Sequence, residues 1–350
     1  MTTAVESYQA PPPERSAGVW VTAWRRLASD KVGMASLAVV AGFLVLILAA
    51  ALGLVASSWQ KEVGVPDAPP TFVGPRTQSE GIDVAAGVTA KDARPVDLSD
   101  IDPLAPKYKE WAERAAKIQI TETPRADTLP FGGDRLGRDI VAKVIKGAEI
   151  SIFVGVFAAV LATLIGTVLG AVAGYAGGRV GDLLEWVYNV FTSIPGILLI
   201  FAFAAVLGRG IGTVILILGL AGWTGIYRLV RAEYIKHRTR EYVRAAEAIG
   251  ASHFSRMFVH ILPNVSHVVL VQLSLYVVFF IKAEVILSFL GLGVRVDQVS
   301  WGTMLSEAQA ELVLGHWWQL VATTISMALF VTAFSLLTDA LRDALDPKLR

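Results

Sequence analysis

Residue types that carry catalysis or bind metals are few in this chain, and they are poorly spaced for either task. The five histidines form neither H-E-x-x-H nor another ligand spacing, and there is no cysteine. Ser193, Ser274 and Ser288 have no His or Asp at a spacing that suggests a nucleophilic triad. No G-x-x-x-x-G-K-[ST] occurs, so the chain lacks a P-loop for ATP. We therefore expect no enzyme activity and no metal or cofactor bound by this chain.

Two charged residues, Lys282 and Glu284, interrupt the long apolar stretch "FFIKAEVILSFLGLG". A charge inside a membrane span is costly and usually has a function. Two positions apart on a helix, the side chains point to different faces and should not pair. We expect Lys282 to extend its amine to the outer interface and Glu284 to face the interior of the helix bundle.

The elements that position these residues are membrane helices. The chain is 54% hydrophobic and 17% charged, with a mean hydropathy of +0.56, whereas soluble domains average about 25% charged residues. Six stretches are long and apolar enough to cross a bilayer as helices, near 34–57, 150–174, 184–207, 211–231, 264–290 and 318–341. Pro195 lies inside the third and should kink it. The sequence thus predicts an all-α integral membrane protein with six transmembrane helices.

Glycines in the second span predict close packing against another helix. They repeat every four residues and so share one face: Gly166, Gly170, Gly174 and Gly178. Small residues at this spacing let two membrane helices approach closely.

Basic residues predict the orientation of the chain. Arg25, Arg26 and Lys31 precede the first span, so the leader 1–33 is cytoplasmic. Alternation of the spans then places the loop 232–263 and the C-terminal tail inside as well. Segment 58–128 falls outside, where we expect an extracytoplasmic insertion after helix 1 that is partly irregular. A disordered linker is the alternative for this segment.

The inside loop contains "REYVRAAEAIGA", a charged amphipathic stretch between two apolar spans. Its apolar residues fall at helical spacing on one expected face: Tyr242, Val243, Ala246 and Ile249. Gly250 should end this helix, and Pro263 should close a second short run before the fifth span. The two runs form either a surface helix lying at the headgroups or a docking element for a soluble partner.

The same loop resembles the EAA loop of ABC importer permeases. That family's pattern is Glu-Ala-Ala, three residues, Gly, nine residues, Ile, any residue and Leu-Pro. Five positions match: Ala245, Ala246, Gly250, Leu262 and Pro263. Arg244 replaces the leading Glu, and His260 replaces the Ile.

Four further motifs are similar to the C-type subunit of dipeptide/oligopeptide permeases. They are "LPFGGDRLGRDIVAKVIKGAEISIFVGV" (129–156), "AEVILSFLGLGV" (283–294), "SWGTML" (300–305) and "LRDALDPKLR" (341–350). The resemblance covers about 129–350. Trp186 and Asn189 stand where that group often has Arg and Asp, and the insertion at 59–127 is longer than usual.

The resemblance implies a type I ABC importer permease fold, with residues 129–350 as its core, in a bacterial inner membrane with both termini cytoplasmic. It implies a homologous permease subunit, two ABC ATPase subunits that bind ATP and Mg, and an extracytoplasmic substrate-binding protein as partners, beside membrane lipid. The net charge of +1 gives no indication of a nucleic-acid partner. The residues expected to couple to an ATPase are Tyr242, Arg244, Ala245, Ala246, Glu247, Gly250, Leu262 and Pro263. The candidates for the translocation path are Pro195, Glu284 and Ser288.

The cargo implied by the resemblance is a dipeptide or oligopeptide. An ABC permease for nickel, an opine or a glycoside is the first alternative. An ion-coupled secondary transporter would call for paired acidic residues at mid-membrane and an inverted repeat, neither of which we find in the sequence. A membrane-bound enzyme or assembly factor would need a catalytic cluster or a separately folded domain.

Overall fold

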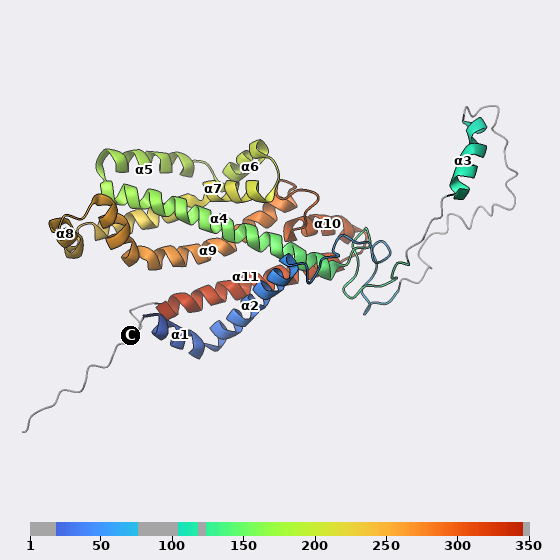
Figure 1. Cartoon of the computed structure of the whole chain (residues 1–350), viewed down its shortest axis with the longest axis horizontal. Coiled ribbons are helices and arrows are strands. Elements are labelled where there is room, and N and C mark those ends of the chain that lie inside the picture. The colour runs from blue at the N-terminus through green and yellow to red at the C-terminus, as the bar shows by residue number, and fades with distance from the viewer. Residues whose placement is uncertain (1–18, 76–103, 118–123, 346–350) are drawn as a thin grey trace, which may run out of the picture. The chain divides into compact units, whose positions relative to one another are not determined.

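The computed structural model describes residues 19–75, 104–117 and 124–345, which are built almost entirely from helices (Figure 1). The helices are α1 (Val19–Ser29), α2 (Lys31–Ala51), α3 (Ala105–Lys117), α4 (Ile140–Ala176), α5 (Gly178–Thr192), α6 (Gly196–Leu207), α7 (Ile211–His237), α8 (Glu241–Ala248), α9 (Leu262–Phe289), α10 (Trp301–Val313) and α11 (Trp318–Leu345). A π-helical segment, η2 (Ser255–Ile261), leads directly into α9. The chain divides into two compact units, Gln60–Ile140 and the remainder.

Five helical stretches in the larger unit are long and apolar enough to cross a membrane: Lys31–Ala51, Ile140–Ala176, Ile211–His237, Ser255–Phe289 and Trp318–Ala344. They correspond to five of the six predicted spans. The remaining predicted span, 184–207, is a bent pair made of α5 and α6. The all-α membrane fold is therefore confirmed, with six spans when the bent pair counts as one.

The bend between α5 and α6 is 85° and falls at the predicted proline. Ser193 caps the end of α5 through its N–H bond to Asn189 O, and Pro195 caps the start of α6. Proline cannot donate a backbone hydrogen bond, and it disfavours helical geometry in the residue before it. The expected kink is thus a complete break between two helices.

Glycines of α4 allow α7 to pack closely against it. A Cβ on Gly166, Gly170 or Gly174 would lie 2.5–2.7 Å from a backbone oxygen of α7, which is closer than carbon and oxygen can approach. The predicted contact face is therefore confirmed for these three residues. Gly178 does not belong to it, because α4 ends at Ala176 and Gly178 begins α5.

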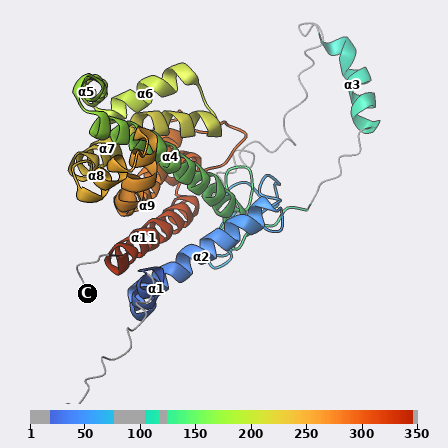
Figure 2. The same cartoon turned by 60° about the vertical axis from the view of Figure 1, so that its left-hand side comes forward.

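Helix α2 packs along α11, as both views show (Figure 2). Phe43 of α2 meets Phe330 of α11 edge to face, with ring centroids 5.2 Å apart. Phe330 is buried in the main core with Trp301, the first residue of α10. The first and last spans are thus held together, although they are far apart in the sequence.

The smaller unit pairs residues 60–75 with residues 124–140 through backbone hydrogen bonds. Val65 N–H donates to Ala126 O and Thr71 N–H donates to Leu129 O, both at 2.9 Å. Leu129 is buried here, as is the carboxylate of Asp134, which accepts the N–H groups of two nearby residues. The boundary expected at 128/129 therefore falls inside this unit. The rest of the insertion, apart from α3 and its neighbours, lies outside the described residues.

Candidate coupling site

Helix α8 is a short element whose end is fixed by a glycine. It spans eight residues, and Gly250 follows with a φ of 85°. Gly250 N–H donates to Glu247 O at 2.9 Å, and Ala251 N–H donates to Ala246 O at 3.0 Å. These two bonds form a Schellman motif, which requires a residue with left-handed backbone geometry just after the helix. Gly250 is that residue, so the expected helix stop is present.

One face of α8 is buried and another is exposed. Val243 and Ala246 pack inward, and Val243 joins the main core with Ile261 and Val265. Ile249, which the spacing predicts on the same face, is 84% exposed. Three residues turn a helix through about 300°, which is about 60° short of a full turn. Two such steps lead from Val243 to Ile249, so Ile249 points away from the face that contains Val243. The prediction of one continuous apolar face is wrong.

Arg256 of η2 holds α8 in place. Its side chain is buried, and its guanidinium forms an ion pair with Glu247 at 2.6 Å. The same group donates to His253 Nδ1 at 3.0 Å and lies 5.9 Å from the ring centre of Tyr175, near the end of α4. One arginine thus connects α8, η2 and α4.

Further hydrogen bonds attach the loop to the end of α7. The hydroxyl of Tyr242 is 2.8 Å from His237 Nδ1, and burial raises the pKa of this phenol. Tyr234 of α7 donates its hydroxyl to Met257 O at 3.0 Å. The loop is therefore fastened to a membrane helix at both of its helical segments.

Pro263 begins a helix instead of closing one. It occupies the first turn of α9, where a missing N–H leaves no hydrogen bond unmade. Leu262, the preceding residue, packs against the main core. The second predicted run is thus continuous with the fifth span, as one helical stretch from Ser255 to Phe289.

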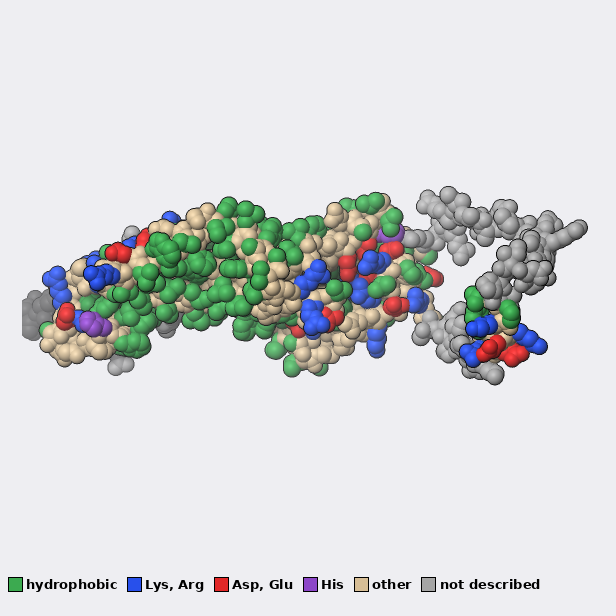
Figure 3. All heavy atoms as spheres, turned by 90° about the horizontal axis from the view of Figure 1, so that it is seen from above, with side chains coloured by type: hydrophobic (Ala, Val, Ile, Leu, Met, Phe, Trp, Pro, Cys, Tyr) green, Lys and Arg blue, Asp and Glu red, His purple; other side chains and the backbone are tan. Residues whose placement is uncertain are grey.

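The remaining predicted coupling residues lie at the surface. Arg244 and Ala245 are exposed, as is Glu247 in part. Arg244 and Glu247 line a groove of about 690 Å³ with Arg238 and His253. Figure 3 shows Lys, Arg and His side chains gathered at the α8 end, next to a broad hydrophobic band over the spans. The loop thus exposes charged residues and two large apolar side chains, those of Ile249 and Phe254.

The structure places the three predicted path residues in different environments. Pro195 is exposed at the break between α5 and α6. Glu284 and Ser288 are buried, and Ser288 Oγ donates to Glu284 Oε1 at 2.6 Å. Ser288 Oγ also accepts the N–H of Val294 at 3.3 Å, which ties α9 to the loop that follows it. Glu284 faces the interior as expected, and the role of these residues in a path stays a prediction.

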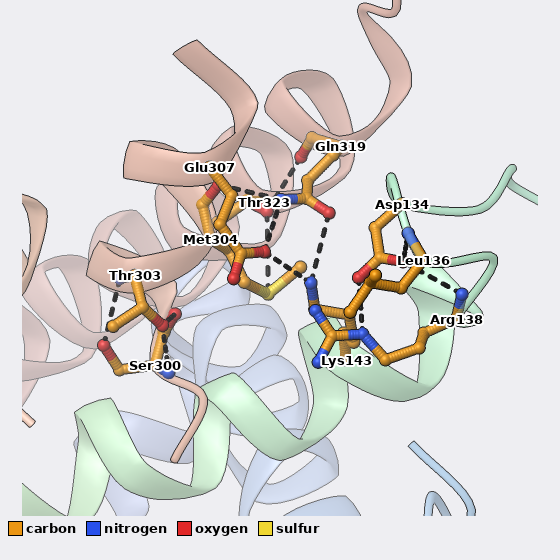
Figure 4. A network of polar contacts seen from close by, with 10 residues as sticks. All are labelled: Asp134, Leu136, Arg138, Lys143, Ser300, Thr303, Met304, Glu307, Gln319 and Thr323. Atoms are coloured by element: carbon orange, nitrogen blue, oxygen red, sulfur yellow. Dashed lines mark hydrogen bonds and ion pairs between the residues drawn. The ribbon is translucent and has the colours of Figure 1, made fainter. Parts of the chain in front are cut away.

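A buried polar network was not predicted from the sequence (Figure 4). Lys143 of α4 is fully buried, and its amine donates to Glu307 Oε2 at 2.6 Å and Gln319 Oε1 at 3.4 Å. Gln319 in turn donates to Met304 O at 3.0 Å. The network joins α4, α10 and α11. The signal available in the sequence was a group of charged residues, Lys143, Lys146 and Glu149, at the start of an apolar span.

Helices that are long and apolar enough to cross a bilayer, joined by a loop with a short exposed helix, define an integral membrane protein. A family model described as "Binding-protein-dependent transport system inner membrane component" matches residues 166–350. The chain belongs to this family. The resemblance to importer permeases is thereby confirmed, and the family is one of transport components, not of catalytic subunits.

Individual relatives agree with the family assignment. The chain is 41% identical over 227 residues to the dipeptide transport system permease protein of Bacillus subtilis (strain 168), covering 65% of this chain and 71% of the relative. It is 36% identical over 246 residues to the oligopeptide transport system permease protein of the same organism, covering 70% and 80%. A glutathione transport system permease protein of Shigella flexneri serotype 5b is 41% identical over 222 residues, covering 63% and 72%.

Proposed function

We propose that this chain is one of two permease subunits in an ATP-driven importer of dipeptides or oligopeptides. The names of relatives that are 36–41% identical to it support the cargo. Membership of the binding-protein-dependent transport family supports delivery of that cargo by a separate binding protein. A homologous permease would complete the path, and two ATPase subunits would supply the energy that a chain without a P-loop cannot.

The observation that carries this proposal is the exposed surface of α8 on a fixed support. Ile249, which follows the last residue of α8, and Phe254, a few residues further on, are 84% and 67% exposed and so are available to a partner. Arg256 and Val243 hold the same helix against the spans. A rigid apolar projection of this kind can transmit displacement from an ATPase that closes around it. We place α8 and both termini on the cytoplasmic side, as the basic residues predict.

The test is transport by the purified complex of both permeases and both ATPases in liposomes, with the binding protein and ATP on opposite sides. We expect ATP-dependent uptake of a labelled dipeptide or tripeptide. Ile249→Asp should lower uptake about tenfold or more, because a central apolar contact at an interface is worth about 2 kcal/mol. Ile249→Leu keeps an apolar side chain and should retain most activity.

The possible outcomes test the peptide cargo and the contact between α8 and an ATPase separately. Uptake of nickel, an opine or a glycoside in place of peptides would retain the importer and reject the peptide cargo. Equal uptake by Ile249→Asp, Ile249→Leu and the unsubstituted complex would show that the α8 surface does not seat in an ATPase.

A further inference from the structure

Helix α9 presents an exposed stripe along the outer half of its span. The stripe residues follow one another at four, three and four positions, which keeps them on one face: Leu275, Phe279, Lys282 and Ile286. Lys282 is the charged member of this otherwise apolar stripe. Because intramembrane charges usually face protein or a cavity, this face of α9 is expected to be covered or to line a path.

A cavity of about 650 Å³ lies beside the stripe, between α6, α7 and α9. Among the described residues that line it, Lys282 alone carries a charge, and most of the others are apolar, including Ile197, Phe201 and Phe280. The hydroxyl of Tyr276 is already engaged, since it donates to Gly222 O at 2.8 Å and accepts the N–H of Ile226 at 3.1 Å. Lys282 is therefore the group in this cavity that is best able to bind an anion.

Within the part of the chain that the structure describes, Lys282 has neither a hydrogen bond nor an ion pair. Glu284, the nearest carboxylate in sequence, is buried and bonded to Ser288. Asp339 shares a second, smaller groove with Lys282, of about 240 Å³ between α9 and α11, and forms no ion pair with it. An amine in an apolar setting without a counterion calls for an anion from elsewhere.

We propose that Lys282 is a path residue that binds the C-terminal carboxylate of the transported peptide, while the apolar wall beside it receives the last side chain. This inference rests on the proposed function, because only a peptide path brings such a carboxylate to α9. The charge complementarity is direct, and the cavity volume lies in the range typical of small-molecule sites. A lipid phosphate carries the same kind of charge, but lipid bound at Lys282 would affect uptake of a peptide acid and of its amide equally, so the two sources can be told apart.

A lysine also suits a site that must release what it binds. Its ammonium is a strongly hydrated point charge on a flexible stem, whereas arginine holds a carboxylate with two parallel bonds. A translocation path needs binding that is strong enough for entry and weak enough for exit. A single unsupported amine in an otherwise apolar cavity meets both conditions.

The experiment compares two forms of one peptide, the free acid and its C-terminal amide, in the reconstituted complete complex. Initial uptake rates are measured for the unsubstituted chain, Lys282→Gln, Lys282→Arg and the stripe control Leu275→Met, which lies outside the cavity lining. Every complex is loaded by the same binding protein, so any preference of that protein cancels when the acid-to-amide ratio is compared between variants.

We expect Lys282→Gln to lower uptake of the free acid about tenfold or more, as for loss of a charge-assisted hydrogen bond, and to leave the amide unchanged. Lys282→Arg should restore most of the acid-to-amide ratio, and Leu275→Met should not alter it. Equal losses for acid and amide, or failure of Lys282→Gln to assemble, would assign Lys282 to a structural contact with the partner permease. No change in either rate would mean that Lys282 only reaches the headgroups. Absence of peptide uptake by the unsubstituted complex would instead refute the proposed function itself.

Discussion

At the residue scale, Gly250 sets the end of α8 through its backbone. Its φ of 85° is open to glycine, tolerated by asparagine and strongly disfavoured for β-branched residues. A Cβ at this position meets nothing within 4 Å, so substitution tests the backbone alone. Gly250→Val should destabilise the Schellman turn by about 2 kcal/mol and reduce ATP-driven uptake several-fold. Gly250→Asn should stay close to the unsubstituted rate.

Assembly provides the control for this pair, because no membrane span is altered by either change. The amount of ATPase that co-purifies should fall for Gly250→Val and not for Gly250→Asn. Matching uptake by the two variants would mean that the shape of the α8 end does not matter for coupling.

A second residue-scale prediction concerns the ion pair between Glu247 and Arg256. Glu247 is 62% exposed, so its loss removes a pair screened by water, worth about 1 kcal/mol or less. Arg256 is mostly buried and contacts His253 and Tyr175 as well. Arg256→Leu should therefore lower the thermal unfolding midpoint of the purified complex clearly more than Glu247→Gln. The double variant should resemble Arg256→Leu, and a drop twice as large would contradict a network shared by the two residues.

Single residues also show where sequence reasoning succeeds and where it stops. The helix stop at Gly250 and the inward direction of Glu284 follow from local chemistry and helical spacing. The direction of the Ile249 side chain could not be predicted in this way, because four residues define the buried face of a two-turn helix poorly. The network of Lys143 could not be predicted, since Glu307 and Gln319 lie 164 and 176 positions away in the chain.

At the element scale, the contact between α4 and α7 depends on missing side chains. A Cβ on Gly170 would lie 2.7 Å from Tyr227 O, a rigid backbone atom. Gly170→Ala should destabilise the complex by about 1–3 kcal/mol through forced separation of the helices. A Cβ on Gly42 of α2 would meet nothing within 4 Å, so Gly42→Ala should be neutral or stabilising by up to about 1 kcal/mol.

Thermal melts followed by loss of the assembled complex would compare these two alanine variants directly. Similar midpoints for Gly170→Ala and the unsubstituted complex would show that α7 can move away from α4 without penalty.

The extent of each helix is less predictable than its existence. Span 150–174 corresponds to α4, which begins ten residues earlier, at Ile140. A hydropathy criterion excludes that first part because it contains charges, yet Lys146 pairs with Glu149 at 2.7 Å and Lys143 with Glu307. The proline in span 184–207 predicts a bend, but its size of 85° depends on the turn around it. The prediction for Pro263 chose the wrong helix end, because proline suits both the first turn and the residues after a helix.

At the scale of the whole molecule, the smaller unit predicts which part of the insertion can be removed. Residues 60–75 and 124–140 are hydrogen-bonded to each other, so the stretch between them is a connection within one unit. Replacing 76–123 by a flexible Gly/Ser linker should leave assembly of the complex intact. Deleting 60–75 should reduce the yield of the complex, because it exposes Leu129 and unpairs the backbone of the retained half. Equal yields would show that the pairing is dispensable, and the uptake rate of the linker variant measures what 76–123 contributes to transport.

A further whole-molecule prediction concerns sidedness. The chain has no native cysteine, so single cysteines report their position without interference. Asp127→Cys and Ala248→Cys lie at exposed positions in the smaller unit and in α8. In sealed spheroplasts, an impermeant maleimide should label the first and spare the second until the membrane is opened. Labelling of both from outside would contradict the predicted orientation.

The length of α4 has a mechanical consequence. Its 37 residues extend about 56 Å, nearly twice the thickness of the hydrocarbon core. Near one end Tyr175 lies beneath Arg256, and near the other Lys143 pairs with Glu307 of α10. An uninterrupted helix pivoting by about 5° about its midpoint carries each end through about 2.4 Å. A rigid rotation of α4 would therefore displace the loop that contains α8 and the helix α10 together, in opposite directions, because the two contact opposite ends of one continuous helix.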